Sequence, residues 1–93
     1  MQVVKRDGRL VSFREEKIVQ AILKAFMDVD KQITVDTKKI AEGIAAFVMT
    51  QGEILSVETI QDLVEEKLME SDRKDVAKAY IIYRNDRSRI RNK

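Results

Sequence analysis

The sequence predicts an α+β domain that is mainly α, with a four-helix bundle capped by a small three-stranded β-sheet. A hairpin signal, Asp7-Gly8 between two apolar stretches, lies near the N-terminus. Four later segments repeat apolar residues at three- and four-residue steps, which is the period of an amphipathic helix. The chain has no proline, so no helix interior is interrupted. Its 93 residues suffice for one hydrophobic core, and we expect a single domain over residues 1–93.

The N-terminal hairpin is expected over residues 3–13. Two short strands, Val3–Lys5 and Leu10–Phe13, flank the turn. The dipeptide Asp7-Gly8 is typical of a two-residue turn in which both residues adopt positive φ. A turn of this kind does not require the cations Lys5 and Arg6, so their presence needs another explanation.

The remaining elements follow from apolar periodicity and from helix start and stop signals. Ser12 and Glu15 fit a capping box for the first helix. Gly52 is expected to end the second helix in the left-handed conformation. A short apolar stretch after it predicts a third strand that pairs with the hairpin. The predicted elements are helices over about 14–28, 36–50, 57–70 and 73–90, and a strand over 54–56.

Composition excludes several classes of chemistry. The chain has no cysteine and no histidine, so disulfides, thiolate zinc sites and Cys- or His-based catalysis are absent. No pair of acids stands out as a catalytic or metal site, and we expect neither. The 18 basic and 16 acidic residues give a net charge of +2, which is too small to indicate nucleic acid by itself. No apolar run approaches 18 residues, so we expect a cytoplasmic protein without a membrane partner.

Three cations are expected to meet at one helix start. The hairpin brings Lys5 and Arg6 to the N-terminal end of the first helix, whose first turns carry Lys17. Free backbone N–H groups at a helix N-terminus already favour anions. Each cation alone is explained as an exposed surface charge, but their convergence favours a phosphate site.

Other polar residues have a structural interpretation beside a functional one. Ser56 is expected to cap the third helix. The fourth helix carries arginines at helical spacing, which suit a helix C-terminus without any ligand. Acids on the third helix are interpreted as a solvated face. The arginines are Arg84, Arg87 and Arg91, and the acids are Glu58, Asp62, Glu65 and Glu66.

Four blocks of the sequence resemble the ATP-cone domain in the family's order. They are "VVKRDGRLVSF", "EEKIVQAI", "SVETIQDLVEEKLME" and "VAKAYIIYR", and together they cover nearly the whole chain. The resemblance implies a four-helix bundle capped by a three-stranded sheet, which agrees with the periodicity. The last block looks most like the N-terminal regulatory domain of an anaerobic, class III ribonucleoside-triphosphate reductase.

The resemblance also implies a set of nucleotide-binding residues. In the family, the first strand meets the adenine, the KRDG cations meet the phosphates, and a lysine in the first helix also reaches the nucleotide. Residues at the start of the third helix and after the "AYIIY" block are further matches. Arg14 stands where the family often has aspartate. The implied binding residues are Val3, Val4, Lys5, Arg6, Lys17, Ser56, Gln61 and Arg84.

The implied function is regulatory rather than catalytic. The family binds ATP or dATP, with Mg2+ as an accompanying ion, and controls the overall activity of an attached ribonucleotide reductase. The expected partners are the nucleotide effector, the rest of the reductase chain and its homo-oligomer. Two alternatives stay open: a nucleic-acid-binding or nucleotide-sensing repressor module, and a structural interaction domain.

Overall fold

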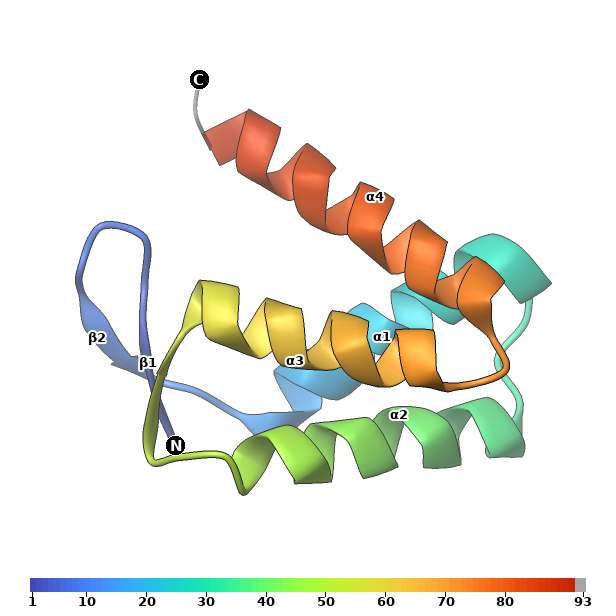
Figure 1. Cartoon of the computed structure of the whole chain (residues 1–93), viewed down its shortest axis with the longest axis horizontal. Helices are drawn as coiled ribbons and strands as arrows, with labels where there is room; N and C mark the ends of the chain where they lie inside the picture. The colour runs from blue at the N-terminus through green and yellow to red at the C-terminus, as the bar shows by residue number, and fades with distance from the viewer. Residues whose placement is uncertain (92–93) are drawn as a thin grey trace.

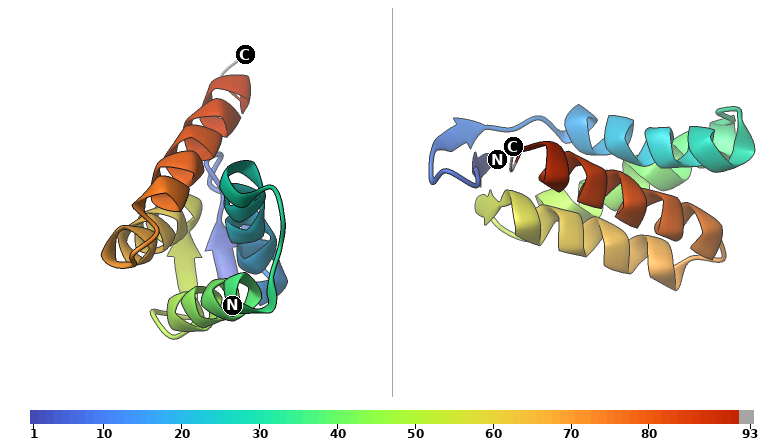
Figure 2. Two further views of the ribbon diagram at one scale, coloured as in Figure 1. Left: turned by 90° about the vertical axis from the view of Figure 1, so that its right-hand side faces the viewer. Right: turned by 90° about the horizontal axis from the view of Figure 1, so that it is seen from above.

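The computed structural model describes the backbone of residues 1–91 and the side chains of residues 1–85. It confirms the predicted fold class, because four helices form a bundle and a small sheet closes one end of it (Figures 1 and 2). In chain order the elements are β1 (Gln2–Val4), β2 (Leu10–Ser12), α1 (Glu15–Asp30), α2 (Val35–Met49), β3 (Ile54–Ser56), α3 (Val57–Glu70) and α4 (Lys74–Arg91).

The hairpin loop differs from the predicted turn. Gly8 has a φ of 88°, but Asp7 does not adopt positive φ, so the expectation that both residues do so is wrong. The Gly8 N–H donates to the Lys5 carbonyl at 2.9 Å, and the Lys5 N–H donates to the Arg9 carbonyl at 2.8 Å. This pattern is a three-residue loop with glycine in the left-handed position. Hydrogen bonds from the Arg9 backbone and side chain lower the pKa of Asp7.

The sheet has the order β2-β1-β3, with β1 in the centre. β1 is antiparallel to β2 and parallel to β3, so the predicted third strand is confirmed. In the parallel pair Val4 lies opposite Ser56, which places the end of β1 beside the start of α3. Val3 is 1% exposed and joins the sheet to the helical core.

The start of α1 corrects the predicted capping box. The N-cap residue is Arg14, and no side chain caps this helix end. Ser12 cannot serve because it still belongs to β2. The helix also continues beyond the predicted end, to Asp30, where Lys31 adopts the left-handed conformation and its N–H donates to the carbonyl of Met27.

The end of α2 differs from the prediction, whereas the start of α3 agrees with it. Gly52 does not adopt positive φ, so the predicted glycine stop is wrong. Instead α2 ends at Met49, and the Thr50 hydroxyl donates to the Phe47 carbonyl at 2.6 Å. Ser56 caps α3 as predicted, because its Oγ accepts the N–H of Thr59 at 3.0 Å.

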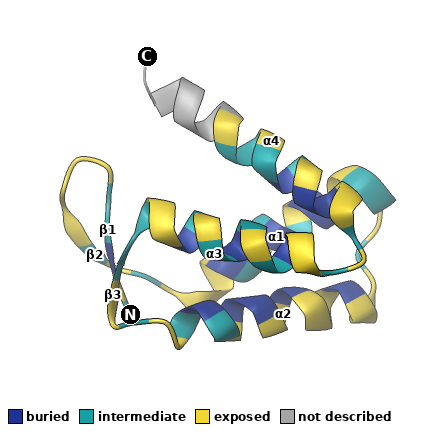
Figure 3. Cartoon of the chain, in the orientation of Figure 1, coloured by how far each residue is buried: buried dark blue, intermediate teal, exposed yellow. Residues whose placement is uncertain are grey.

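The core lies between the four helices, whose buried faces point toward one another (Figure 3). Apolar side chains at helical spacing supply it, as the sequence pattern predicts. Its largest fully buried side chains are Phe26, Ile22, Leu68, Val3, Val48, Val64 and Val76.

Candidate functional site

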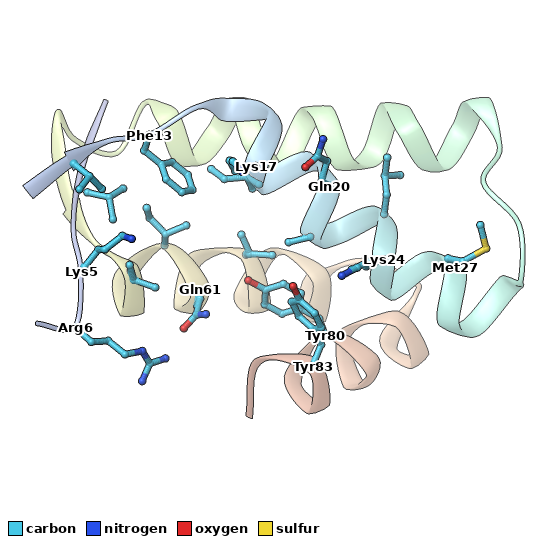
Figure 4. A pocket seen from close by; sticks show the side chains of 18 of the residues that line it. Lys5, Arg6, Phe13, Lys17, Gln20, Lys24, Met27, Gln61, Tyr80 and Tyr83 are labelled. Carbon is cyan, nitrogen blue, oxygen red and sulfur yellow. The ribbon is translucent and has the colours of Figure 1, made fainter. Parts of the chain in front are cut away.

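A cavity of about 760 Å³ opens between the sheet and helices α1, α3 and α4. Val3 and Val11 line it from the sheet, and apolar side chains of α1 and α3 continue the wall. Figure 4 shows polar side chains from the hairpin loop after β1 and from α1, α3 and α4 around this space. The polar side chains that line it are Lys5, Arg6, Lys17, Gln20, Lys24, Gln61, Tyr80 and Tyr83.

The end of β1 supplies two cations to this cavity. Lys5, the residue after β1, directs its ammonium group into the cavity (Figure 4), and it forms no ion pair with any side chain that the structure describes. Arg6 lies at the rim with its side chain 29% exposed, and its guanidinium donates to Oε1 of Glu58 at 3.0 Å. The predicted pair of hairpin cations therefore reaches the cavity together.

Helix α1 supplies a polar stripe along one wall. Lys17, Gln20 and Lys24 are spaced by three and four residues, so they lie on the same helix face. Lys17 is exposed and has no ion pair with a described side chain. The sequence interpretation missed Gln20 and Lys24, although their spacing from Lys17 is a signal that would have found them.

Helix α4 contributes two aromatic rings. The chain's only tyrosines, Tyr80 and Tyr83, both line the cavity. The ammonium group of Lys24 lies 5.4 Å from the centre of the Tyr83 ring, within the range of a cation–π contact. Burial raises the pKa of Tyr80 to about 12, so its hydroxyl is neutral at pH 7. The sequence interpretation assigned neither tyrosine to the site.

Gln61 on α3 lines the cavity and carries a buried acceptor. Its Oε1 has no solvent exposure and no hydrogen-bond partner among the described residues. Leaving a buried acceptor unpaired costs about 1–3 kcal/mol. A ligand that donates a hydrogen bond here, such as a hydroxyl or an amine, would satisfy it.

Five of the eight residues predicted for the site line the same cavity, and three do not. Ser56 lies at the first turn of α3, where its hydroxyl also donates to Oγ1 of Thr59 at 2.9 Å. Val4 is the last residue of β1 and does not line the cavity either. The five residues that line it are Val3, Lys5, Arg6, Lys17 and Gln61.

Arg84 is the third predicted residue outside the cavity lining. Its guanidinium pairs with Asp62 at 2.8 Å and Glu65 at 3.2 Å, and its side chain is 17% exposed. The two acids therefore connect α3 to α4. Asp62 is exposed as predicted for a solvated face, whereas Glu65 is only partly exposed. The side chains of Arg87 and Arg91 lie outside the described residues.

Other classes of site find no support in the part of the chain that the structure describes. Among these residues there is no group of three or more acidic side chains that could hold a metal ion. Within the same part, no helix is long and apolar enough to cross a membrane.

The cavity suits a ligand with a strongly anionic part and a flat, weakly polar part. Lysine and arginine donors match phosphate oxygens, whereas the valines and tyrosines match an aromatic ring. These features define a small α+β domain with a nucleotide-type cavity. The ATP cone domain model matches residues 1–89, and the chain belongs to this family.

The relatives are ribonucleotide reductases of several kinds. The chain is 45% identical to part of the vitamin B12-dependent ribonucleoside-diphosphate reductase of Thermoplasma acidophilum, with 97% of this chain and 12% of that protein covered. It is 40% identical to part of the anaerobic ribonucleoside-triphosphate reductase of Haemophilus influenzae, with 98% and 13% covered. For the ribonucleoside-diphosphate reductase subunit alpha of Chlamydia pneumoniae the identity is 36%, with 91% and 9% covered. The chain thus spans about a tenth of the length of these relatives.

Proposed function

We propose that this domain binds ATP or dATP as an allosteric effector and controls the overall activity of an attached ribonucleotide reductase. The observation that carries the proposal is the convergence of Lys5, Arg6 and Lys17 on one cavity. Two of these cations, Lys5 and Lys17, have no carboxylate partner among the described side chains, so their donors are available to phosphate oxygens.

The proposed pose places the triphosphate at the cations and the base deeper in the cavity. The adenine lies against Val3, with the backbone of Val4 as a further contact. Gln61 accepts a hydrogen bond from the nucleoside, since its Oε1 has no partner among the described residues. Ser56 and Arg84 are already engaged in a helix cap and an ion-pair network, so their effect on the nucleotide is indirect.

Regulation needs more than binding. ATP and dATP differ by one ribose hydroxyl, and one hydrogen bond contributes only about 0.5–1.5 kcal/mol. A ligand shifts an equilibrium only by its differential affinity for the two states. The proposal therefore requires that the two effectors favour different arrangements of the domain with the rest of the reductase chain and its homo-oligomer.

The domain itself has a binding role rather than a catalytic one. We propose that the radical chemistry belongs to the rest of an anaerobic ribonucleoside-triphosphate reductase, in the cytoplasm. Mg2+ that accompanies the nucleotide is bound by phosphate oxygens, because no group of acidic side chains for a metal exists in the described part of the domain.

Calorimetry with ATP, dATP and a short DNA duplex tests this function against its alternatives. A regulatory nucleotide domain binds the mononucleotides more tightly than the duplex. A nucleic-acid-binding module does the reverse, and its affinity for the duplex falls steeply as salt rises. A structural interaction domain binds none of the three, and that result would contradict the proposal.

A further inference from the structure

The carboxylate of Glu58 contacts one of the cations at the cavity. The Arg6 guanidinium donates to Oε1 of Glu58 at 3.0 Å, and the two side chains are 29% and 57% exposed. Glu58 does not line the cavity itself. The sequence interpretation placed Glu58 on a solvated face, so this contact has no counterpart among the predicted site residues.

The register of the sheet builds this contact. Val4 of β1 lies opposite Ser56 of β3 in a parallel pair, and both strands end at these residues. Two residues after Val4 the segment that follows β1 reaches Arg6. Two residues after Ser56 the chain reaches Glu58 in the first turn of α3. An acid in the first turn is also stabilised by the helix dipole. The fold therefore holds a carboxylate beside Arg6.

A carboxylate and a phosphate use the same donors of an arginine. A nucleotide whose phosphates reach Arg6 must displace Glu58 or share the guanidinium with it, and the negative charge of Glu58 repels the phosphates in both cases. We propose that Glu58 competes with the phosphates of the bound nucleotide for Arg6 and thereby limits the affinity of the site. This inference rests on the proposed function.

The exposure of Glu58 determines how much its charge should weaken nucleotide binding. Because Glu58 is more than half exposed, water screens its charge, and exposed ion pairs contribute little. Removal of the charge should therefore strengthen ATP binding by about two- to fivefold, the range that corresponds to an exposed pair. The effect depends on the charge of the ligand, so it should vanish for adenosine, which has no phosphate.

The test compares E58Q with E66Q in the 93-residue chain. Glu66 is an exposed acid on the same helix and has no ion pair with a described side chain, so E66Q makes the same change in net charge away from Arg6. Calorimetry should give a two- to fivefold lower Kd for ATP in E58Q, little change in E66Q and unchanged adenosine binding in both. In an R6Q background, E58Q should no longer strengthen ATP binding.

Several outcomes would overturn the inference. They are weaker ATP binding in E58Q, equal gains in E58Q and E66Q, and a gain that persists in R6Q. The first would make Glu58 a residue that positions Arg6 for phosphate. In each of these cases wild-type chain still binds ATP, so the proposed function survives. If wild-type chain binds no ATP, the proposed function and this inference both fail.

Discussion

Lys17 gives the most direct single-residue test of the candidate site. It lies in the first turn of α1, lines the cavity and forms no ion pair with a described side chain. A lysine at the N-terminal end of a helix is unfavourable for the helix dipole. Under the proposed function, a phosphate of the nucleotide would give this unfavourably placed cation a partner.

We expect Lys17→Ala to weaken ATP binding by roughly 10- to 100-fold, because a hydrogen bond to a charged group contributes about 1.5–3 kcal/mol. Calorimetry on the folded variant measures this change. Lys38→Ala is the matched control, since Lys38 is exposed on α2 away from the cavity, and it should leave the affinity within twofold. Equal effects of the two substitutions would mean that only net charge matters.

Some residues of the site could be predicted from the sequence, and others could not. Lys17 was found because a hairpin must deliver Lys5 and Arg6 near the helix that follows it. Lys24 follows Lys17 at helical spacing, but its contact with the Tyr83 ring depends on how α4 packs against α1. The unpaired Oε1 of Gln61 also depends on tertiary packing, which no local pattern encodes.

At the scale of elements, an ion-pair cluster fastens the end of α1 to the start of α4. Nη1 of Arg73 donates to Asp30 at 3.0 Å, and Nε of Arg73 donates to Asp75 at 3.2 Å. The guanidinium also lies 5.6 Å from the centre of the Phe26 ring. Hydrogen bonds from Arg73 lower the pKa of both aspartates below the ordinary value of 3.8 and raise that of the arginine.

This cluster predicts a pH dependence of stability. Because the folded-state pKa values of Asp30 and Asp75 are lowered, the stabilisation is fully present above about pH 4 and is lost as pH falls through the folded values. Arg73→Gln should lower Tm at pH 7 and flatten the fall of Tm between pH 5 and pH 2, measured by circular dichroism.

The exposed Lys78 on the same helix provides the control for this prediction. Lys78→Gln removes one positive charge from α4 without touching the cluster, so it should keep the pH profile of wild type. If Arg73→Gln also keeps that profile, the cluster does not contribute to acid stability.

Element boundaries show where local patterns suffice. All four helices were predicted within a few residues because their apolar period is regular. The capping box predicted for α1 was wrong because Ser12 is held in β2 by pairing with Gln2, and strand pairing overrides a local capping signal. The glycine stop predicted for α2 was wrong because Thr50 closes the helix by a side-chain hydrogen bond before Gly52 is reached.

On the scale of the whole molecule, one core supports both the bundle and the cavity. Ile60 and Val64 of α3 lie in the core and also line the cavity. Substitutions that disturb core packing should therefore lower the free energy of unfolding, and they should weaken nucleotide binding because the same residues shape the cavity. The fold class could be predicted because it follows from periodicity, whereas the cavity could not, because it is a space that helix packing leaves unfilled.

Leu68→Ala should lower the free energy of unfolding by about 2–5 kcal/mol, because the side chain is fully buried and its loss leaves a cavity. Urea denaturation measures this change. The neighbouring Met69 is 47% exposed, and Met69→Ala should cost clearly less. Equal losses at the two positions would contradict the assigned core.

The central claim is that cations from β1 and α1 form one nucleotide site with Gln61 and the tyrosines of α4. Titration of ¹⁵N-labelled chain with ATP, followed by two-dimensional NMR, tests it most directly. The account predicts that the largest amide shift changes fall on residues 3–6, the first half of α1 and the start of α3, with small changes on the exposed face of α2. Changes centred on α2, or none at millimolar ATP, would contradict it.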